Sequence, residues 1–293
     1  MNIKQLIMNV VKPINIPITR WILKRHYSAT KPLSGTLGAK RVLVLAPHMD
    51  DETIGPGGIL RKHANEGAEV HVAIITDGSS SVSDLSKEAL TAARMKEMDE
   101  VKSILGIHTI HYLGLPDGGV KSNEASQSKV ESLINDIEPD IIYSTPFVDA
   151  HPDHTATVKT LSDVLKKRQQ KDTVVRLYEI NCPFPPTHVN CVVDISETMA
   201  DKQKAIDVFS SQVIAFDGFV ELNRLKSKMV NQSIKYAEVF MEFTPKKLNH
   251  HCDTLDKHRE SFPHVFKQAN RTDTLLWAIY KNNKWKTKLY EDS

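Results

Sequence analysis

Several signatures of well-known enzyme classes are missing from this 293-residue chain. It has three cysteines, Cys182, Cys191 and Cys252, and no Cys-x-x-Cys pair. An odd set without paired spacing argues against a disulfide scaffold, so we expect packing residues in a cytoplasmic protein. No GxSxG string occurs, so the sequence does not indicate a serine nucleophile at a strand-to-helix turn. No GxGxxG follows the first expected strand, which argues against a dinucleotide site.

Acidic residues are absent from the first 49 positions, which carry eight basic residues, whereas the whole chain has a formal net charge of only +2. Apolar residues repeat at helical spacing through this leader, around Pro13 and Pro17. A basic amphipathic helix with a tryptophan can lie on an anionic membrane face, and it can equally be an additional helix packed on the domain. Both interpretations stay open here: packing, or peripheral contact with the inner face of a membrane.

The leader contains no segment that could span a bilayer. Lys12 and Arg20 interrupt its apolar runs well before the roughly 20 residues that a spanning helix needs. No small-residue cleavage pattern follows a signal-like apolar region. The basic stretch has little aromatic interleaving and the rest of the chain is acidic overall, so we expect no nucleic-acid partner.

Two short strings, far apart in the sequence, carry most of the chemical information. PHMDDE (47–52) follows the apolar run 42–46, and HPDH (151–154) follows the apolar run 140–146. Both runs read as buried strands. Because the carboxyl ends of parallel strands meet at one edge of a sheet, both strings are expected to reach the same crevice.

The residue types in these strings favour a metal site. His48 and Asp51 are three residues apart, so one turn can place a nitrogen and an oxygen about 2.0 to 2.2 Å from a single ion. Two adjacent ionised aspartates repel each other unless a cation lies between them, so Asp50 and Asp51 suggest one base and one ligand. The alternative is a polar loop with Asp51 as the N-cap of the next helix, which explains neither His48 nor the second carboxylate.

The pattern of apolar runs predicts an α/β fold, a Rossmann-like three-layer sandwich with a mostly parallel sheet. We expect strands at 41–46, 69–75, 108–113, 140–145 and 173–180, alternating with helices at 57–66, 87–105, 125–137 and 155–168.

Further strings point to a family. PHMDDE, the later DAHPDH (149–154), YLGLPDG (112–118), AARMKEM (92–98), KQKAIDVFSSQ (202–212) and YAEVFMEF (236–243) resemble the PIG-L/LmbE-type zinc-dependent N-acetylglucosaminyl deacetylases. That family usually has HPDDE, and Met49 here replaces its proline without removing a ligand. The likeness suggests three parts: a basic amphipathic extension (1–39), a deacetylase domain (40–243) and a C-terminal extension packed on it (244–293).

The resemblance also implies roles. Zinc, or another divalent metal such as Fe²⁺, would be held by His48, Asp51 and His154. Asp50 would be the general base that takes a proton from the attacking water. His151, oriented by Asp153, would donate to the oxyanion and to the departing amine. The reaction would remove the N-acetyl group from an N-acetylglucosamine-type sugar, on a small molecule or a lipid-linked glycoconjugate, and release acetate.

Two further residues are candidate substrate contacts. Arg94 lies in the apolar stripe of the helix expected at 87–105, where it either pairs with Glu97 or reaches a sugar hydroxyl, acetate or phosphate. Asp117 either holds sugar hydroxyls or belongs to an ordinary Pro-Asp-Gly turn. Histidines crowd residues 250–264 in no known ligand spacing, so a surface or lid role is expected there.

Two other functions remain open at this level. One is a zinc amidase or esterase that acts on a substrate other than a sugar. The other is a catalytically silent carbohydrate-binding protein, which would have no need of a general base beside its metal.

Overall fold

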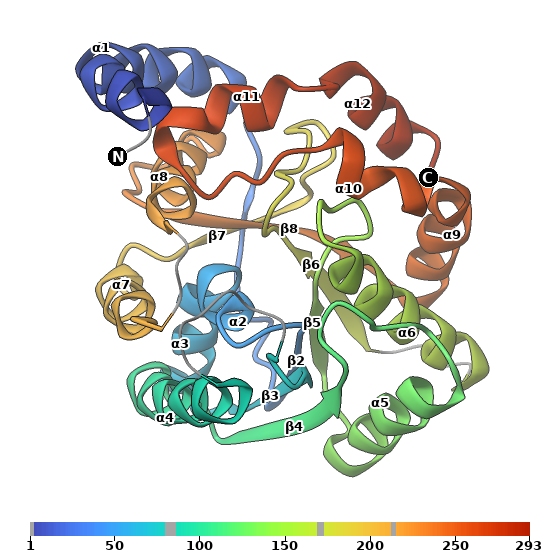
Figure 1. Ribbon diagram of the computed structural model, residues 1–293. Helices are drawn as coiled ribbons and strands as arrows, with labels where there is room; N and C mark the ends of the chain where they lie inside the picture. Colours follow the sequence, from blue (N-terminus) through green and yellow to red (C-terminus); the bar gives the residue numbers. More distant parts are fainter. Residues whose placement is uncertain (1–2, 80–85, 169–172, 212–214) are drawn as a thin grey trace.

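The protein is described by a computed structural model over residues 3–79, 86–168, 173–211 and 215–293. Within these residues the strands form one eight-stranded sheet in the order β1-β7-β8-β6-β5-β2-β3-β4 (Figure 1). The strands are β1 (Leu33–Ser34), β2 (Arg41–Ala46), β3 (Glu69–Thr76), β4 (Thr109–Leu115), β5 (Ile141–Ser144), β6 (Val174–Tyr178), β7 (Cys191–Asp194) and β8 (Ala237–Phe243).

Strands β2 to β6 run parallel, and β8 is antiparallel to both β6 and β7. Strand β2 lies at the centre of these five parallel strands, where Val44 pairs with Val72 of β3 on one side and with Tyr143 of β5 on the other. The chain therefore adds strands first on one side of β2 and then on the other. This reversal is the point at which open α/β sheets bind their ligands.

Helices cover both faces of the sheet. They are α1 (Ile3–His26), α2 (Asp51–Ile54), α3 (Gly57–Asn65), α4 (Lys87–Leu105), α5 (Glu124–Ile137), α6 (Pro152–Arg168), α7 (Met199–Val208), α8 (Asp217–Lys226), α9 (Pro245–Leu255), α10 (Phe262–Val265), α11 (Leu275–Tyr280) and α12 (Asn283–Glu291). Figure 1 shows α3, α4 and α7 on one side and α5, α6 and α9 on the other. Short 3-10 helices are η1 (Ser227–Met229), η2 (Asp256–Ser261) and η3 (Thr272–Thr274).

The alternation of side chains along β2 explains the layers. Val42 and Val44 belong to the apolar cluster shared with α3, α4 and α7, whereas Leu43 and Leu45 belong to the cluster shared with α5, α6 and α9. Because both faces are covered, the strand is apolar from Val42 to Ala46. The predicted three-layer fold is confirmed, and the five predicted strands and four predicted helices are present with ends that differ by at most a few residues.

The leader folds as a helix packed on the rest of the chain. Helix α1 contacts α8, η3 and α11, and its residues Thr19 and Leu23 are fully buried, as is Tyr27 just after the helix. The packing that was one expectation for the leader is thus observed. Among the described residues, no helix combines the length and the apolar character needed to cross a membrane.

The C-terminal segment also packs on the sheet. Leu248, Phe262 and Leu289 share one buried cluster with Leu43 of the central strand. Cys182, Cys191 and Cys252 are buried and free, as expected of packing residues.

His251 is buried as well, and its Nδ1 lies 2.8 Å from the hydroxyl of Ser293, so this member of the histidine-rich segment packs inside the molecule, contrary to the surface or lid role expected for that segment.

Candidate active site

The loop after β2 holds its polar residues in a turn with an unusual backbone. Asp50 has a φ of +149° and a ψ of −28°, although it is not a glycine. Such conformations cost of order 1–3 kcal/mol and persist where the surroundings fix them. Here the amide of His48 donates to Asp51 Oδ2 at 3.0 Å, and the amide of Asp50 donates to Glu52 Oε2 at 3.2 Å. The turn presents His48, Asp50 and Asp51 to one cleft.

Helix capping does not account for these carboxylates. Asp51 is the first residue of α2 and not its N-cap, contrary to the alternative considered from the sequence. The N-cap is Asp50, whose side chain accepts no capping hydrogen bond. Both carboxylates are nevertheless buried, with 7% and 2% of their surface exposed.

The first turn of α6, which follows β5, supplies the second group. His154 is buried beside Asp149, with His154 Nδ1 3.2 Å from Asp149 Oδ1. Asp149 also accepts hydrogen bonds from the amide of His151 at 2.9 Å and from the side chain of Asn181 at 2.8 Å. This carboxylate holds one nitrogen of His154 and leaves the other free to face β2.

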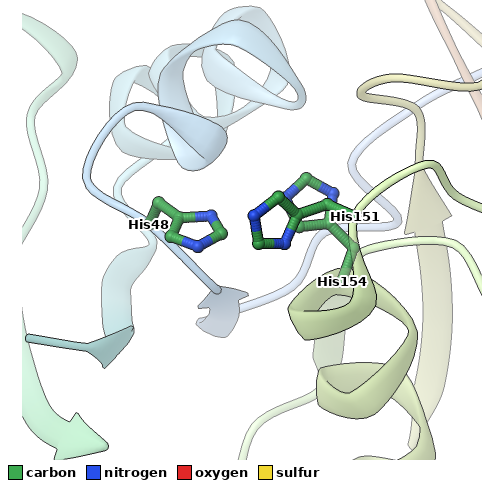
Figure 2. A group of neighbouring side chains, drawn as sticks. All are labelled: His48, His151 and His154. Atoms are coloured by element: carbon green, nitrogen blue, oxygen red, sulfur yellow. The ribbon is translucent and has the colours of Figure 1, made fainter. Parts of the chain in front are cut away.

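The two groups meet at the carboxylate of Asp51. Its Oδ2 lies 3.2 Å from His48 Nδ1 and 3.3 Å from His154 Nε2. Ring nitrogens of His48, His151 and His154 also lie within 4.8 Å of one another, and Figure 2 shows the three rings facing a common space. Two imidazoles and a carboxylate that converge in this way are the donor types that zinc and similar divalent ions take.

A second set of donors shares His48. Its Nε2 lies 3.3 Å from Asp117 Oδ1 and 3.4 Å from Asp153 Oδ2. The carboxylate of Asp153, however, already accepts the amides of Gly118 at 2.7 Å and Val120 at 3.1 Å. His154, by contrast, is held by a carboxylate at its other nitrogen, the arrangement usual for metal-binding histidines. The geometry therefore favours the set that contains Asp51 and His154.

The protonation of the cluster has the signature of a cation site. Burial raises the pKa of Asp51, but His154 and His48 outweigh burial and bring that pKa well below its ordinary value. Burial lowers the pKa of His154, yet Asp51 and Asp149 outweigh it and raise that pKa to about 10. The carboxylates thus hold positive charge on the imidazoles. A divalent ion can take the place of those protons.

Asp50 sits in a different electrostatic environment. Burial first, and then the charge of Asp51, raise the pKa of Asp50 well above its ordinary value, while His48 and Arg94 lower it. Burial also raises the pKa of the neighbouring Glu52 to about 7. A carboxyl group whose pKa is shifted towards neutrality is suited to taking up a proton during a reaction.

His151 carries its proton on the nitrogen that faces away from its own turn. Its Nδ1 accepts the backbone amide of Asp153 at 3.3 Å, so a neutral ring has its proton on Nε2. Burial first, and then the positive charges of His154 and His48, lower the pKa of His151 to about 4. The carboxylate of Asp153 turns to His48 and to the 118–120 loop, so the contact between Asp153 and His151 is made by the main chain.

The two candidate substrate residues both line the cleft. Arg94 is 2% exposed and donates to the carbonyl of Gly78 at 3.2 Å. Glu97, the ion-pair partner considered for it, accepts hydrogen bonds from Ser210 and from the amide of Ser211 at 2.8 Å. Asp117 is more than a turn residue, because its carboxylate contacts His48.

Sequence reasoning missed several residues of the cleft. Its lining also includes Ile180, Asn181, Phe216, Phe219, Gln268 and Asn270. Asp149 stood within the DAHPDH string, so its nearness to His154 could have been inferred. Ile180 and Asn181 follow the expected strand 173–180, so the strand-end rule could have indicated them, whereas the other four follow no motif and reach the cleft through tertiary packing.

Comparisons with known proteins identify the family of the chain. A sequence model of the family described as "PIG-L: GlcNAc-PI de-N-acetylase" matches residues 43–165, which include both motif strings. A diacetylchitobiose deacetylase of Thermococcus kodakarensis is 30% identical over 187 residues, covering 59% of this chain and 70% of that protein. The chain belongs to the PIG-L family.

Other PIG-L relatives match a larger part of the chain. A probable N-acetyl-alpha-D-glucosaminyl L-malate deacetylase 2 of Bacillus subtilis is 26% identical over 214 residues, covering 69% of this chain and 95% of the relative. The crystal structure of N,N'-diacetylchitobiose deacetylase from Pyrococcus horikoshii superposes with a TM-score of 0.63 at 25% identity, covering 71% of this chain and 85% of that one. This PIG-L member thus has the family fold and a His/Asp cluster that could hold a metal ion.

Proposed function

We propose that this protein is a hydrolase that removes the N-acetyl group from an N-acetylglucosamine-type amino sugar, releasing acetate and a free amine. One observation carries the proposal: Asp51 joins the imidazoles of His48 and His154 at the end of the central strands, with the buried carboxyl of Asp50 beside them. The names of the relatives, which are deacetylases of N-acetylated sugars, support it.

We assign His48, Asp51 and His154 as the ligands of one zinc ion, with Fe²⁺ as the alternative metal. The donor set fits, because two neutral imidazoles and one carboxylate leave a coordination position open. Asp149 would keep His154 in the tautomer that presents Nε2. A metal ion held there would act as a Lewis acid and lower the pKa of a water molecule towards 7.

Asp50 is assigned as the general base. Its carboxylate takes a proton from the water that attacks the acetamide carbon, and burial helps by raising its affinity for that proton. Arg94 interacts with this carboxylate electrostatically and lines the same cleft. Arg94 would therefore bind an oxygen of the sugar or of the departing acetate while it also limits the rise in the pKa of Asp50.

We assign His151 as the proton donor to the reacting carbonyl oxygen and to the departing amine. Its Nε2–H donates a hydrogen bond to the carbonyl oxygen as negative charge develops there. The backbone amide of Asp153 fixes the ring in this tautomer. Protonation of the departing amine then requires the proton that Asp50 has taken up, passed on directly or by way of His151.

The substrate side of the cleft is assigned to Arg94 and Asp117, with Asp117 accepting hydrogen bonds from sugar hydroxyls. The rest of the substrate would be a small molecule or a lipid carrier. We place the protein in the cytoplasm, in peripheral contact with the inner face of the membrane, and keep three parts as domain limits: 1–39, 40–243 and 244–293. The basic leader and the free cysteines support this placement.

The test is an Asp50→Asn variant assayed on N-acetylglucosamine conjugates by mass spectrometry for the loss of one acetyl group. We expect kcat to fall by about 10²–10⁴-fold, because a general base is lost, while the zinc content stays unchanged. The exposed Asp136 on α5 gives a matched control, Asp136→Asn, which should keep full activity.

Removing the metal separates the alternatives. Chelation should abolish acetate release, and added Zn²⁺ should restore it. Turnover of simple esters or of amides without a sugar, at rates like those for the sugar, would favour an amidase or esterase. Full activity of Asp50→Asn, or of the chelated protein, would contradict the proposal.

A further inference from the structure

Helix α1 has apolar side chains on two faces, and only one of them is needed for packing. On the inner face Thr19 and Leu23 are fully buried. On the outer face four large apolar residues are exposed, and we call them the docking stripe: Val11 (40%), Ile14 (66%), Ile18 (48%) and Trp21 (62%). Their spacing of three, four and three residues places them in one line along the helix.

Packing on the domain does not explain this stripe. A helix that covers a globular protein normally turns polar residues to the solvent, because exposed apolar surface is unfavourable in water. Single exposed apolar residues are ordinary, but a continuous row of them marks a surface that meets another apolar phase. Figure 1 shows α1 at the edge of the molecule, with its outer side turned away from the sheet.

The charges beside the stripe are positive. Lys24 and Arg25 are exposed at the end of α1, and the guanidinium of Arg25 lies 5.4 Å above the Trp21 ring. The guanidinium of Arg20 hydrogen-bonds to Glu221, although the Arg20 side chain remains 44% exposed. Helix α1 itself contains no acidic residue. An apolar stripe with basic residues beside it is complementary to an apolar phase that is bordered by negative charge.

A second group of exposed aromatic side chains, with lysines nearby, lies next to α1. The ring of His26 at the end of α1 lies 5.3 Å from that of Tyr280 on α11, and Tyr280 is 43% exposed. On the same short helix Trp277 is 54% exposed, with the ammonium of Lys267 at 4.9 Å and that of Lys281 at 5.8 Å from its ring. Tryptophan and tyrosine flanked by lysine are typical of the membrane interface.

We propose that the docking stripe of α1 inserts into the interface of an anionic membrane, with Lys24 and Arg25 on the lipid phosphates. Lys24 and Arg25 favour a membrane as the binding partner of the stripe, because an anionic lipid surface offers both an apolar phase and negative charge. A second copy of the chain that docked through the same helix would offer no acidic residue to Lys24 and Arg25, because α1 contains none. This proposal concerns binding and stands independently of the deacetylase assignment.

On the side of α1 away from the docking stripe, Ile16 and Arg20 line a groove together with Phe216, and Phe216 also lines the active-site cleft. This groove therefore belongs to the side of α1 that faces the domain.

The experiment measures cosedimentation of the full chain with vesicles of phosphatidylglycerol mixed into phosphatidylcholine, and with vesicles of phosphatidylcholine alone. We expect binding to the anionic vesicles that falls as salt is raised. Ile14→Glu/Ile18→Glu should lower the partition coefficient at least tenfold, since two charges enter the apolar phase. Lys24→Gln/Arg25→Gln should lower it about 25-fold, because each cation near an anionic surface is worth about fivefold.

Two control variants make the same kinds of substitution outside α1. Leu33→Glu/Leu37→Glu places two acids on exposed apolar residues of the leader outside α1, and Lys246→Gln/Lys247→Gln removes two exposed cations from α9. Both should bind as the parent chain does. Circular dichroism checks the fold, and the Lys24→Gln/Arg25→Gln variant decides the matter if the glutamate variant unfolds.

Three results would overturn the proposal. One is unchanged vesicle binding by both α1 variants. Another is equal binding to neutral vesicles without salt dependence. The third is a dimer in gel filtration that Ile14→Glu/Ile18→Glu dissociates, which would assign the stripe to a second copy of the chain.

Discussion

Asp149 acts on the candidate metal site through His154. It is fully buried and sits behind the imidazole, at 3.2 Å from Nδ1. We predict that Asp149→Asn lowers the affinity for zinc by about tenfold or more, because the charge that keeps Nε2 a strong donor is lost. Competition with a chromogenic chelator measures this affinity directly. Asp136→Asn serves as the control, and an unchanged affinity in Asp149→Asn would remove this residue from the site.

His63 links stability to pH at a position away from the cleft. It is fully buried, its Nε2 lies 2.9 Å from the hydroxyl of Tyr143, and burial followed by the charge of Arg176 lowers the pKa of His63 to about 4. The unfolded chain takes up this proton near pH 6.5, so between pH 6.5 and 4 it binds more protons than the folded protein. The contribution of neutral His63 to the free energy of unfolding is fully present above pH 6.5 and is lost as the pH falls from 6.5 towards 4.

We therefore predict that His63→Gln flattens the fall in the free energy of unfolding between pH 6.5 and 4. Urea titrations of the parent and the variant at a series of pH values measure the difference in slope. His258 is less buried, and the variant His258→Gln controls for the loss of a histidine elsewhere in the chain. Identical slopes in His63→Gln and the parent would show that folding does not lower the pKa of His63.

The sequence was sufficient for residues whose role is local. His48 and Asp51 are one turn apart, and their convergence follows from that spacing and from the strand before them. Gln268, Asn270 and Phe216 could not be predicted, because they reach the cleft only through the path of the C-terminal segment and of α8. The strained backbone of Asp50 was likewise invisible, since aspartate has no marked preference for that conformation.

At the level of elements, β2 to β6 were predictable because they are mainly apolar runs that alternate with helical patterns, whereas β7 and β8 were not. Strand β7 has only four residues. Strand β8 follows outside that alternation, and it carries a buried Glu238 as its second residue. The charge is tolerated because Lys202 donates to it at 2.6 Å and the amides of Gly58 and Ile59 donate at 2.8 and 2.9 Å.

This network ties α3 and α7 to β8, and it gives a prediction. Glu238→Gln leaves the ammonium of the fully buried Lys202 without a counter-charge, so we expect the free energy of unfolding to fall by about 3–5 kcal/mol. Adding Lys202→Met to Glu238→Gln removes the uncompensated ammonium and should recover part of the lost free energy of unfolding. Urea unfolding of the parent, both single variants and the double variant forms the cycle. Additive effects would show that the two side chains do not interact.

At the scale of the whole molecule, the three proposed parts share one core. The cluster that contains Leu43 and Ile142 of the central strands also contains Leu23 of α1 and Phe262, Leu275 and Leu289 of the C-terminal segment. Extensions that complete the core of a domain should unfold together with it. The sequence left packing and membrane contact open for the leader and predicted that the C-terminal extension packs on the domain, but it could not show that both extensions complete one core.

The protein offers a direct way to test this cooperativity. Its three tryptophans, Trp21, Trp277 and Trp285, all lie in the extensions, so their fluorescence reports on those parts while far-ultraviolet circular dichroism reports on the whole. We predict coincident urea transitions for the two signals. Phe262→Ala should shift both transitions together by about 3–5 kcal/mol, because the ring is fully buried against Phe266 and Trp285. Tyr280→Ala, at a half-exposed ring, should shift neither by much. A fluorescence transition that moves alone in Phe262→Ala would show that the C-terminal segment folds as a separate unit.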